Sequence, residues 1–418
     1  MVRGILRVVL ITLVAVFLIG GAYIGGFGVS RLIFAPTALP DGGAPAEWQA
    51  NFPVFWEAWN YVHQDFYKAE IDDSALVNGA VSGMVDSLGD PHTLFIDAKR
   101  AAISQSQMQG SFEGIGATVE MREGRLTIVA PIKDSPAEKA GLRPDDVVLQ
   151  VDDKIIQNMD INEAVSLIRG PKGTTVRLKI QRARQVPFDV SIVRDTIKTT
   201  SVEARLIEGT NLGYVELSQF SATVPEDLDD ALQALMAQNV KGLILDLRGN
   251  PGGFLSVTID VASQFLSPGQ QVVVIKDKNG NENPCPDDIG RPVKCTTKPG
   301  GRATSMPIVV LIDKGSASAS EIVAAALQDH GRAKLVGVKT FGKGSVQNDH
   351  SLSDGSELNV TIAHFFSPKG HEINDVGVAP DVQVELTEDD IVNRRDLQLD
   401  KAIELLKAQV GTTSLLVR

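Results

Sequence analysis

Residues 308–331 read IVVLIDKGSASASEIVAAALQDHG, a sequence that predicts a buried strand, a turn and a helix in succession. It opens with five apolar residues in a row, which is typical of a strand buried on both faces of a sheet. A turn with Gly315 and three serines follows, and the alanine-rich segment after it has the composition of a helix. A buried strand that leads directly into a helix is the repeating unit of an α/β domain.

The same alternation runs through residues 198–385. Because apolar strands alternate there with helices, we expect an α/β core with a mostly parallel sheet. The strand-like runs are 213–218, 242–247, 272–277, 308–313, 334–338 and 358–366, and the helix-like runs include 226–239 and 321–331.

Three further regions flank this core. Residues 47–102 have a helical pattern, in which Phe55 and Trp59 share an apolar face. Residues 103–197 contain short strands and two short helices, which predicts a separate mixed α+β domain. Residues 386–418 predict a helical C-terminal segment.

The N-terminus predicts a membrane anchor. Residues 8–29 are 22 in a row without a charge, enough to span a bilayer, and Arg3 and Arg7 precede them. The positive-inside rule then places the N-terminus in the cytoplasm and the rest of the chain on the extracytoplasmic side of the cell membrane. We expect a transmembrane helix in residues 1–30 and a linker at 31–46, and a cleaved signal peptide is the alternative.

The net charge and the cysteine content limit the partners and the kinds of site that the chain can have. The net charge of −12 over 418 residues argues against nucleic acid as a partner, because phosphate contacts need a basic surface. The only two cysteines, Cys285 and Cys295, lie in a segment at 279–302 that looks like an insertion. In an oxidising compartment such a pair predicts a disulfide. A zinc site would need more ligands than this segment has, and we expect neither a metal nor a cofactor.

Three stretches follow predicted strands of the core. They are DLRGNPGG at 246–253, GSASASE at 315–321 and KTFGKGSVQ at 339–347. In an open α/β sheet, reactive groups gather outside the carboxyl ends of the strands, so we expect these three stretches to meet. The glycines of the first stretch predict either a tight turn or backbone amides that face an anion.

The serines of GSASASE admit two interpretations. Ser318 and Glu321 have the spacing of a helix-capping box, which is the commoner role of a serine before a helix. A nucleophilic serine needs a base, and none of the six histidines lies in a recognisable triad context. A neutral lysine is the other option. Lys343, flanked by glycines and four residues before Gln347, is one candidate, Lys314 is a second, and spacing does not rank them.

Taken together, these motifs resemble the carboxyl-terminal processing (tail-specific) peptidases, a family of serine endopeptidases with a Ser/Lys dyad and a PDZ domain. The matching pieces cover nearly all of the chain beyond the linker. They include SLGDPHTLF, GSFEGIGA, LILDLRGNPGG, GSASASEIVAAALQDHGRAKLVG, KTFGKGSVQ and GVAPD.

The resemblance implies a role for individual residues. Ser318 would be the nucleophile, Lys343 its general base and Gln347 the residue that orients the lysine. The amides of Gly253 and Ala319 would form the oxyanion hole. Ser316 and Ser320 would then be small polar neighbours, with Ser320 the residue that caps the helix.

The resemblance also implies that residues 103–197 are a PDZ domain with a circularly permuted strand order. Its carboxylate-binding loop would be Gly114, Ile115, Gly116 and Ala117. Backbone amides of that loop receive a C-terminal carboxylate while the peptide adds to the sheet as a strand.

The sequence therefore predicts a membrane-anchored, extracytoplasmic serine endopeptidase that recognises C-terminal tails and cleaves proteins or peptides near their C-termini. A catalytically silent PDZ protein that only binds tails is the alternative. Amphipathic faces in residues 48–88 and in the C-terminal segment leave open whether they pack within one chain or in a homodimer.

Overall fold

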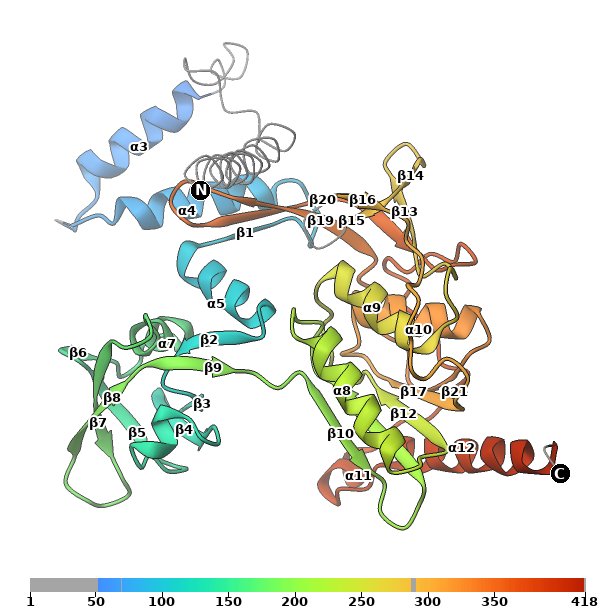
Figure 1. Cartoon of the computed structure of the whole chain (residues 1–418). Helices are drawn as coiled ribbons and strands as arrows, with labels where there is room; N and C mark the ends of the chain where they lie inside the picture. The colour runs from blue at the N-terminus through green and yellow to red at the C-terminus, as the bar shows by residue number, and fades with distance from the viewer. Residues whose placement is uncertain (1–51, 69, 287–290, 417–418) are drawn as a thin grey trace, which may run out of the picture. The chain divides into compact units, whose positions relative to one another are not determined.

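The computed structural model describes residues 52–68, 70–286 and 291–416 (Figure 1). The predicted transmembrane helix at 1–30 and the linker at 31–46 lie outside the described residues. Within the described part of the chain, no helix has both the length and the apolar character that crossing a membrane requires.

The core contains a six-stranded sheet in the order β10-β11-β12-β17-β18-β21. Strand β10 is antiparallel to β11, and each later pair in this order is parallel. The predicted runs at 213–218, 242–247, 308–313 and 334–338 are strands of this sheet. The bounds are β10 (Val202–Leu206), β11 (Leu212–Leu217), β12 (Gly242–Asp246), β17 (Ile308–Ile312), β18 (Lys334–Gly337) and β21 (Val382–Gln383).

Helices cover both faces of this sheet. They are α8 (Val224–Ala237), α9 (Leu255–Phe265), α10 (Ala319–Asp329) and α12 (Leu397–Leu416). Leu243 and Val310 pack in one apolar cluster with α8, α9 and α10. The alternate residues Ile244 and Val309 pack on the other side with Leu406 of α12. Both faces of β12 and β17 are therefore buried, which explains why these strands are continuous apolar runs.

A second sheet was not predicted. It is antiparallel and contains β1 (Leu94–Ile96), β13 (Val274–Asp277), β14 (Glu282–Asn283), β19 (Ser345–Ser351) and β20 (Glu357–Phe366). The runs at 272–277 and 358–366, which we expected in the parallel sheet, are β13 and β20 of this one. The expectation was wrong because β19 and β20 are close in sequence and pair locally as a hairpin, which needs no crossover helix.

Residues 117–193 fold around a core of their own. The sheet order is β3-β4-β5-β7-β8, with β6 paired to β5, and all these pairs are antiparallel. Its buried side chains include Leu126, Ile128 and Leu178. The bounds are β3 (Ala117–Arg122), β4 (Arg125–Pro131), α6 (Pro136–Lys139), β5 (Val147–Val151), β6 (Lys154–Ile155), α7 (Ile161–Ile168), β7 (Thr175–Gln181) and β8 (Phe188–Val193).

Two strands lead into and out of this unit. The entering strand β2 (Ser111–Gly114) pairs antiparallel with the leaving strand β9 (Asp195–Lys198). The two ends of the unit therefore lie side by side. An inserted domain with its ends side by side leaves the fold of the host domain undisturbed, and the pairing of β2 with β9 gives this unit that property.

The two segments that were predicted to be helical, 47–102 and 386–418, contain helices in the structure. They are α3 (Pro53–Asp65), α4 (Asp73–Asp86), α11 (Glu388–Val392) and α12. Helix α5 (Ala98–Met108) was not predicted and crosses the expected boundary at residue 102. Its N-cap is Asp97, whose carboxylate accepts the N–H groups of Lys99 and Arg100. A homodimer through the terminal helices stays a prediction.

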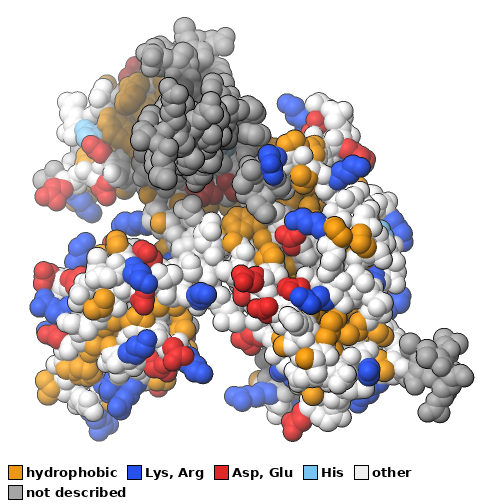
Figure 2. All heavy atoms as spheres, in the orientation of Figure 1, with side chains coloured by type: hydrophobic (Ala, Val, Ile, Leu, Met, Phe, Trp, Pro, Cys, Tyr) orange, Lys and Arg blue, Asp and Glu red, His pale blue; other side chains and the backbone are white. Residues whose placement is uncertain are grey.

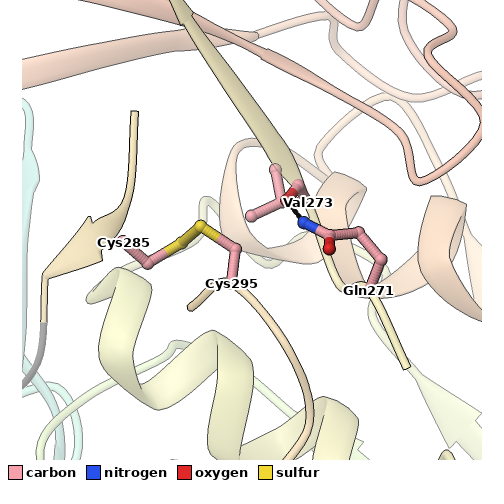
Figure 3. The surroundings of a disulfide bond; sticks show 4 residues. All are labelled: Gln271, Val273, Cys285 and Cys295. Atoms are coloured by element: carbon pink, nitrogen blue, oxygen red, sulfur yellow. Dashed lines mark hydrogen bonds between the residues drawn. A yellow bond between two sulfur atoms is a disulfide. The ribbon is translucent and has the colours of Figure 1, made fainter. Parts of the chain in front are cut away.

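Cys285 and Cys295 form a disulfide that closes the hairpin of β15 (Cys285–Pro286) and β16 (Pro292–Val293). Both cysteines are buried in the apolar cluster of the core. Figure 3 shows the bond beside Gln271 and Val273, which lie just before β13.

Replacing both cysteines with serine is expected to lower the free energy of unfolding by about 2–3 kcal/mol, because the cross-link restricts a short loop in the unfolded chain. Urea denaturation of the double variant and of the wild type, each with and without reductant, measures this. The reduced wild type serves as the control and should resemble the variant. An oxidised wild type no more stable than the variant would contradict the expectation.

Candidate active site

Ser318 lies at the junction of β17 and α10, where the chain turns from strand to helix. It is the N-cap residue of α10, and its φ of 54° and ψ of −114° lie in a region that a non-glycine residue rarely adopts. Such strain persists only where the surroundings impose it, and it is concentrated at functional sites. Ser318 and Glu321 form the predicted capping box, in which the N–H of Ser318 donates to Glu321 Oε2 at 2.9 Å.

The two neighbouring serines are fully buried and committed to the scaffold. The hydroxyl of Ser316 donates to the carbonyl oxygen of Leu247 at 2.7 Å. The hydroxyl of Ser320 donates to the carbonyl oxygen of Asn250 at 3.0 Å. The expectation that Ser320 caps α10 was therefore wrong: Ser318 occupies the cap, and Ser320 lies inside the helix.

The loop 246–253 lies directly against Ser318. The carbonyl oxygen of Asn250 accepts the N–H of Ala317 at 3.0 Å. A Cβ added to Gly252 would lie 2.8 Å from Ser318 Cβ and 3.0 Å from the nitrogen of Ala319. Only glycine allows this close approach, which explains one glycine of the RGNPGG sequence.

The two amides expected to form an oxyanion hole are both unpaired within the described chain. Neither the N–H of Gly253 nor the N–H of Ala319 donates to another described residue. Gly253 has a φ of 152°, and a Cβ there would lie 2.2 Å from the carbonyl oxygen of Phe220. An unpaired amide at a helix N-terminus is a ready donor to an anion.

An ion-pair network fixes the other end of this loop. Arg248 binds Asp246 in β12 and also Asp396, in the segment before α12. Burial lowers the pKa of Arg248, but hydrogen bonds to these two carboxylates outweigh it, and the net effect raises the pKa. The C-terminal segment therefore holds the loop that carries Gly252 and Gly253, a contact that no local motif predicts.

Glu321 has contacts that its capping-box spacing did not predict. Its side chain is fully buried and accepts four hydrogen bonds. Oε1 accepts from the hydroxyl of Thr340 at 2.5 Å and from the N–H of Gly342 at 2.7 Å. Oε2 accepts from the N–H groups of Ser318 and Lys343, each at 2.9 Å. The same oxygen atom, Glu321 Oε2, therefore accepts from the backbone N–H groups of both Ser318 and Lys343. The nitrogen atoms of these two residues are thus no more than twice 2.9 Å apart.

Burial raises the pKa of Glu321, against the four hydrogen bonds that favour its carboxylate. The glutamate was identified from its spacing as a capping residue. Its longer-range bonds to residues 340–343 had no signal in the local sequence.

The structure distinguishes between the two lysines that are candidates for the general base. Lys343 is half-buried and is joined to Ser318 through Glu321. Lys314 is exposed, and no such connection links it to Ser318 in the described chain. No histidine ring in the described residues hydrogen-bonds to residues 315–321.

Gln347 lies in β19, directly opposite Thr361 of β20. Its Nε2 donates to Ser345 Oγ at 2.7 Å and to Thr361 Oγ1 at 3.3 Å. We inferred from four-residue spacing that Gln347 and Lys343 share a face. The register of β19 shifts between Val346 and Gln347, so this simple alternation does not apply there.

The GDPHT turn at 89–93 comes directly before β1, and β1 pairs with the edge of β20 opposite to the edge that pairs with β19. Asp90 accepts the N–H of His92 at 3.0 Å and the hydroxyl of Thr93 at 2.6 Å, and the nearby side chain of Thr361 also favours its carboxylate. Burial raises the pKa of Asp90, but these hydrogen bonds outweigh it and lower the pKa to about 2. Asp90 is therefore ionised at any physiological pH.

Asp90 is expected to stabilise the fold only while it is ionised. Its pKa falls from the ordinary 3.8 to about 2 on folding, so its contribution is present above about pH 4 and is lost as the pH falls toward 2. Urea denaturation of Asp90→Asn and wild type across this range measures it. The wild type should be the more stable at neutral pH, and the gap should close in acid. A gap independent of pH would contradict this origin.

Three residues of the predicted tail-binding loop line a cavity of about 220 Å³. Ile115 and Gly116 contribute from the loop, Ala117 from the start of β3 and Val165 from α7, and the fourth predicted residue, Gly114, lies in β2 instead. Strand β3 is an edge strand of its sheet, paired only with β4 among the described strands. Such an edge can accept a further strand.

A cation also lines this cavity. The Arg169 guanidinium stacks on the ring of Phe112, with 4.4 Å to the ring centroid, and donates to Ser106 Oγ at 2.8 Å. Burial lowers the pKa of Arg169.

Comparison with known proteins identifies the parts of the chain. The profile of Peptidase family S41 matches residues 211–384, that of a PDZ domain matches 127–182, and that of the Activating protease CtpB N-terminal domain matches 42–100. Among solved structures, a photosystem II D1 C-terminal processing protease covers 82% of this chain and 94% of its own, with 28% identity and a TM-score of 0.46.

Curated relatives align over most of the sequence. Carboxy-terminal processing protease CtpA of Bacillus subtilis is 40% identical over 81% of this chain and 70% of its own length. The carboxy-terminal-processing protease of Bartonella bacilliformis is 40% identical over 75% of this chain and 70% of its own length. The chain therefore belongs to peptidase family S41, the family of the carboxy-terminal processing proteases, and is a serine-type peptidase with a PDZ domain.

Proposed function

We propose that this peptidase is anchored in the cell membrane, works on its extracytoplasmic side, and cleaves proteins or peptides near their C-termini with Ser318 as nucleophile and Lys343 as base. One observation carries the catalytic part. The same oxygen of Glu321 accepts the backbone N–H groups of both residues, which keeps their backbones adjacent.

In this proposal each group has one role in the reaction. Lys343 in its neutral form takes the proton of the Ser318 hydroxyl, whose oxygen attacks the carbonyl carbon of the scissile peptide bond. The N–H groups of Gly253 and Ala319 donate to the oxyanion that forms, and each such donor is worth about 10²–10³ in rate. The lysine then gives its proton to the leaving amine, and water releases the acyl group from Ser318.

Substrate selection belongs to the PDZ domain. The tail of the substrate adds to the free edge of β3, and its carboxylate enters the cavity beside Ile115 and Gly116. The cation of Arg169 in the same cavity favours a free carboxylate over a blocked one. Tail binding in turn shifts the enzyme toward its active arrangement, a population shift driven by differential affinity.

The location rests on the sequence and on the disulfide. The charge-free segment 8–29 follows Arg3 and Arg7, and the Cys285–Cys295 bond suits an oxidising compartment. Charged side chains of both signs are interspersed on the surface that Figure 2 shows, with no large basic patch that would suit nucleic acid.

The test uses the full chain in detergent and an unfolded peptide with an apolar tail, offered with a free or an amidated C-terminus. We expect cleavage of the free form to exceed that of the amidated form, and Ser318→Ala to cleave neither. Equal cleavage of the two forms would refute tail recognition, and cleavage by Ser318→Ala would refute the assigned nucleophile. Tail binding without cleavage by the wild type would establish a silent binding protein instead.

A further inference from the structure

The two amides proposed for the oxyanion hole come from segments that are far apart in sequence. Gly253 ends the loop 246–253, and Ala319 is the first residue of α10. Both N–H groups have to point at one oxygen atom, with each nitrogen about 2.7–3.1 Å from it, before the pair can stabilise an oxyanion. The two segments must therefore be aligned with each other, and Asn250 is a residue that contacts both.

The side chain of Asn250 holds the first segment. It is fully buried, and its Oδ1 accepts the N–H of Gly252 at 2.9 Å. Its Nδ2 donates to the carbonyl oxygen of Leu217, the last residue of β11, at 2.7 Å. These partners fix the orientation of the side-chain amide, because a backbone N–H only donates and a backbone carbonyl only accepts. Asn250 thus ties the residue before Gly253 to a strand of the six-stranded sheet.

The backbone of Asn250 holds the second segment. Its carbonyl oxygen accepts the N–H of Ala317 at 3.0 Å and the hydroxyl of Ser320 at 3.0 Å. These two residues lie on either side of Ser318 and Ala319. One residue therefore fixes the start of α10 with its backbone oxygen and the approach to the other amide with its side chain.

The bonds around Gly253 also set the direction of its N–H. The carbonyl oxygen of Gly252 accepts the N–H of Phe220 at 2.8 Å. In a trans peptide this oxygen and the N–H of Gly253 point to opposite sides, so the N–H of Gly253 points away from that of Phe220. The neighbouring amides are occupied, since that of Gly252 donates to Asn250 and that of Phe254 donates to Phe220. Of these three consecutive amides, only that of Gly253 has no partner in the described chain.

We propose that Asn250 is a positioning residue that aligns the amides of Gly253 and Ala319 on the point where the oxyanion forms. It acts through these two backbones and does not itself contact the reacting atoms. The proposal rests on the proposed Ser318 and Lys343 chemistry, and it gives the asparagine of the RGNPGG sequence a task in catalysis.

The main test measures kcat and KM of Asn250→Ala on the tailed peptide, with the full chain. Alanine keeps the backbone oxygen but releases the N–H of Gly252, so the amide of Gly253 should lose its alignment. We expect kcat to fall by about 10²-fold. KM should stay unchanged, because the interaction that is lost is made only in the transition state.

A peptide boronic acid reports on the oxyanion site separately. The oxygen of Ser318 adds to its trigonal boron while the serine proton passes to Lys343, and an oxygen of the tetrahedral adduct takes the place of the oxyanion. In Asn250→Ala its Ki should rise by a factor similar to the fall in kcat. The affinity for the tailed peptide, measured in a Ser318→Ala background that does not cleave it, should not change. A purely structural role of Asn250 would lower stability and leave this Ki as it is.

Ser320→Ala is a second and milder variant. It removes the hydroxyl that donates to the carbonyl oxygen of Asn250, so kcat should fall severalfold, by less than in Asn250→Ala. Ser263→Ala is the matched control, because Ser263 is also a buried serine inside a helix, α9, and donates to the carbonyl oxygen of Ile259 at 2.6 Å. This control should keep the wild-type kcat.

The outcomes separate this role from the dyad. Wild-type kcat in Ser318→Ala or Lys343→Ala would defeat the proposed function itself. If both lose activity, the positioning role is overturned by a wild-type kcat in Asn250→Ala, or by a fall in its kcat without a rise in the Ki of the boronic acid. If Asn250→Ala does not fold, Ser320→Ala decides, and a kcat equal to that of Ser263→Ala would overturn the proposal.

Discussion

Lys343→Ala is expected to lower kcat by about 10⁴-fold while the protein stays folded. The nucleophile would lose the group that takes its proton, and no histidine ring in the described residues bonds to residues 315–321 to replace it. The backbone N–H of Lys343, which binds Glu321, remains in the alanine variant. The fold should therefore survive, and the loss should appear in kcat and not in the melting temperature.

Lys314→Ala is the matched control for this experiment. Lys314 is exposed and lies in the same loop as Ser318, and sequence spacing alone did not rank it below Lys343. We expect this variant to keep its wild-type kcat. If Lys314→Ala were inactive and Lys343→Ala active, the assignment of the base would be reversed.

Glu321→Leu is expected to lower both the stability and the activity of the enzyme. It leaves the N–H groups of Ser318, Gly342 and Lys343 without their acceptor. Each buried group left unpaired costs about 1–3 kcal/mol, so the free energy of unfolding should fall by at least about 3 kcal/mol. Denaturant unfolding measures this loss.

Activity should fall with it, because displacement of a reacting group by about 1 Å can cost about 10²-fold. Glu321→Gln is the control. Its carbonyl oxygen can still accept from Ser318 and Lys343, and of the three N–H groups only that of Gly342, which faces the new amide, loses its acceptor, so it should retain more activity than Glu321→Leu. Equal activity in the two variants, once corrected for the folded fraction, would show that these bonds do not position the site.

The sequence predicts an element well where one local signal decides it. Apolar runs marked β12 and β17 as buried strands, and the spacing of Ser318 and Glu321 marked the start of α10, where the N–H of Ser318 donates to Glu321. Glycines marked the loop at 252–253, where a Cβ would clash with its neighbours. In each case the physical cause lies within a few residues of the signal.

Features that depend on distant residues had no such signal. The second sheet depends on β1 and β13 pairing with the same edge of β20, which is a tertiary choice. The same holds for Arg248 with Asp396 and for Thr93 with Thr361. Glu321 had a local signal, the capping box, and that signal concealed its bonds to residues 340–343.

The most direct test is to identify the residue that a serine-directed fluorophosphonate modifies in the full chain. Intact mass and peptide mapping should show a single adduct, on the Ser318 hydroxyl, in the wild type. Ser318→Ala should show none, and Lys343→Ala should react far more slowly, because its serine keeps its proton. An adduct on another residue of the wild type, or undiminished labelling of Ser318→Ala, would contradict Ser318 as the nucleophile.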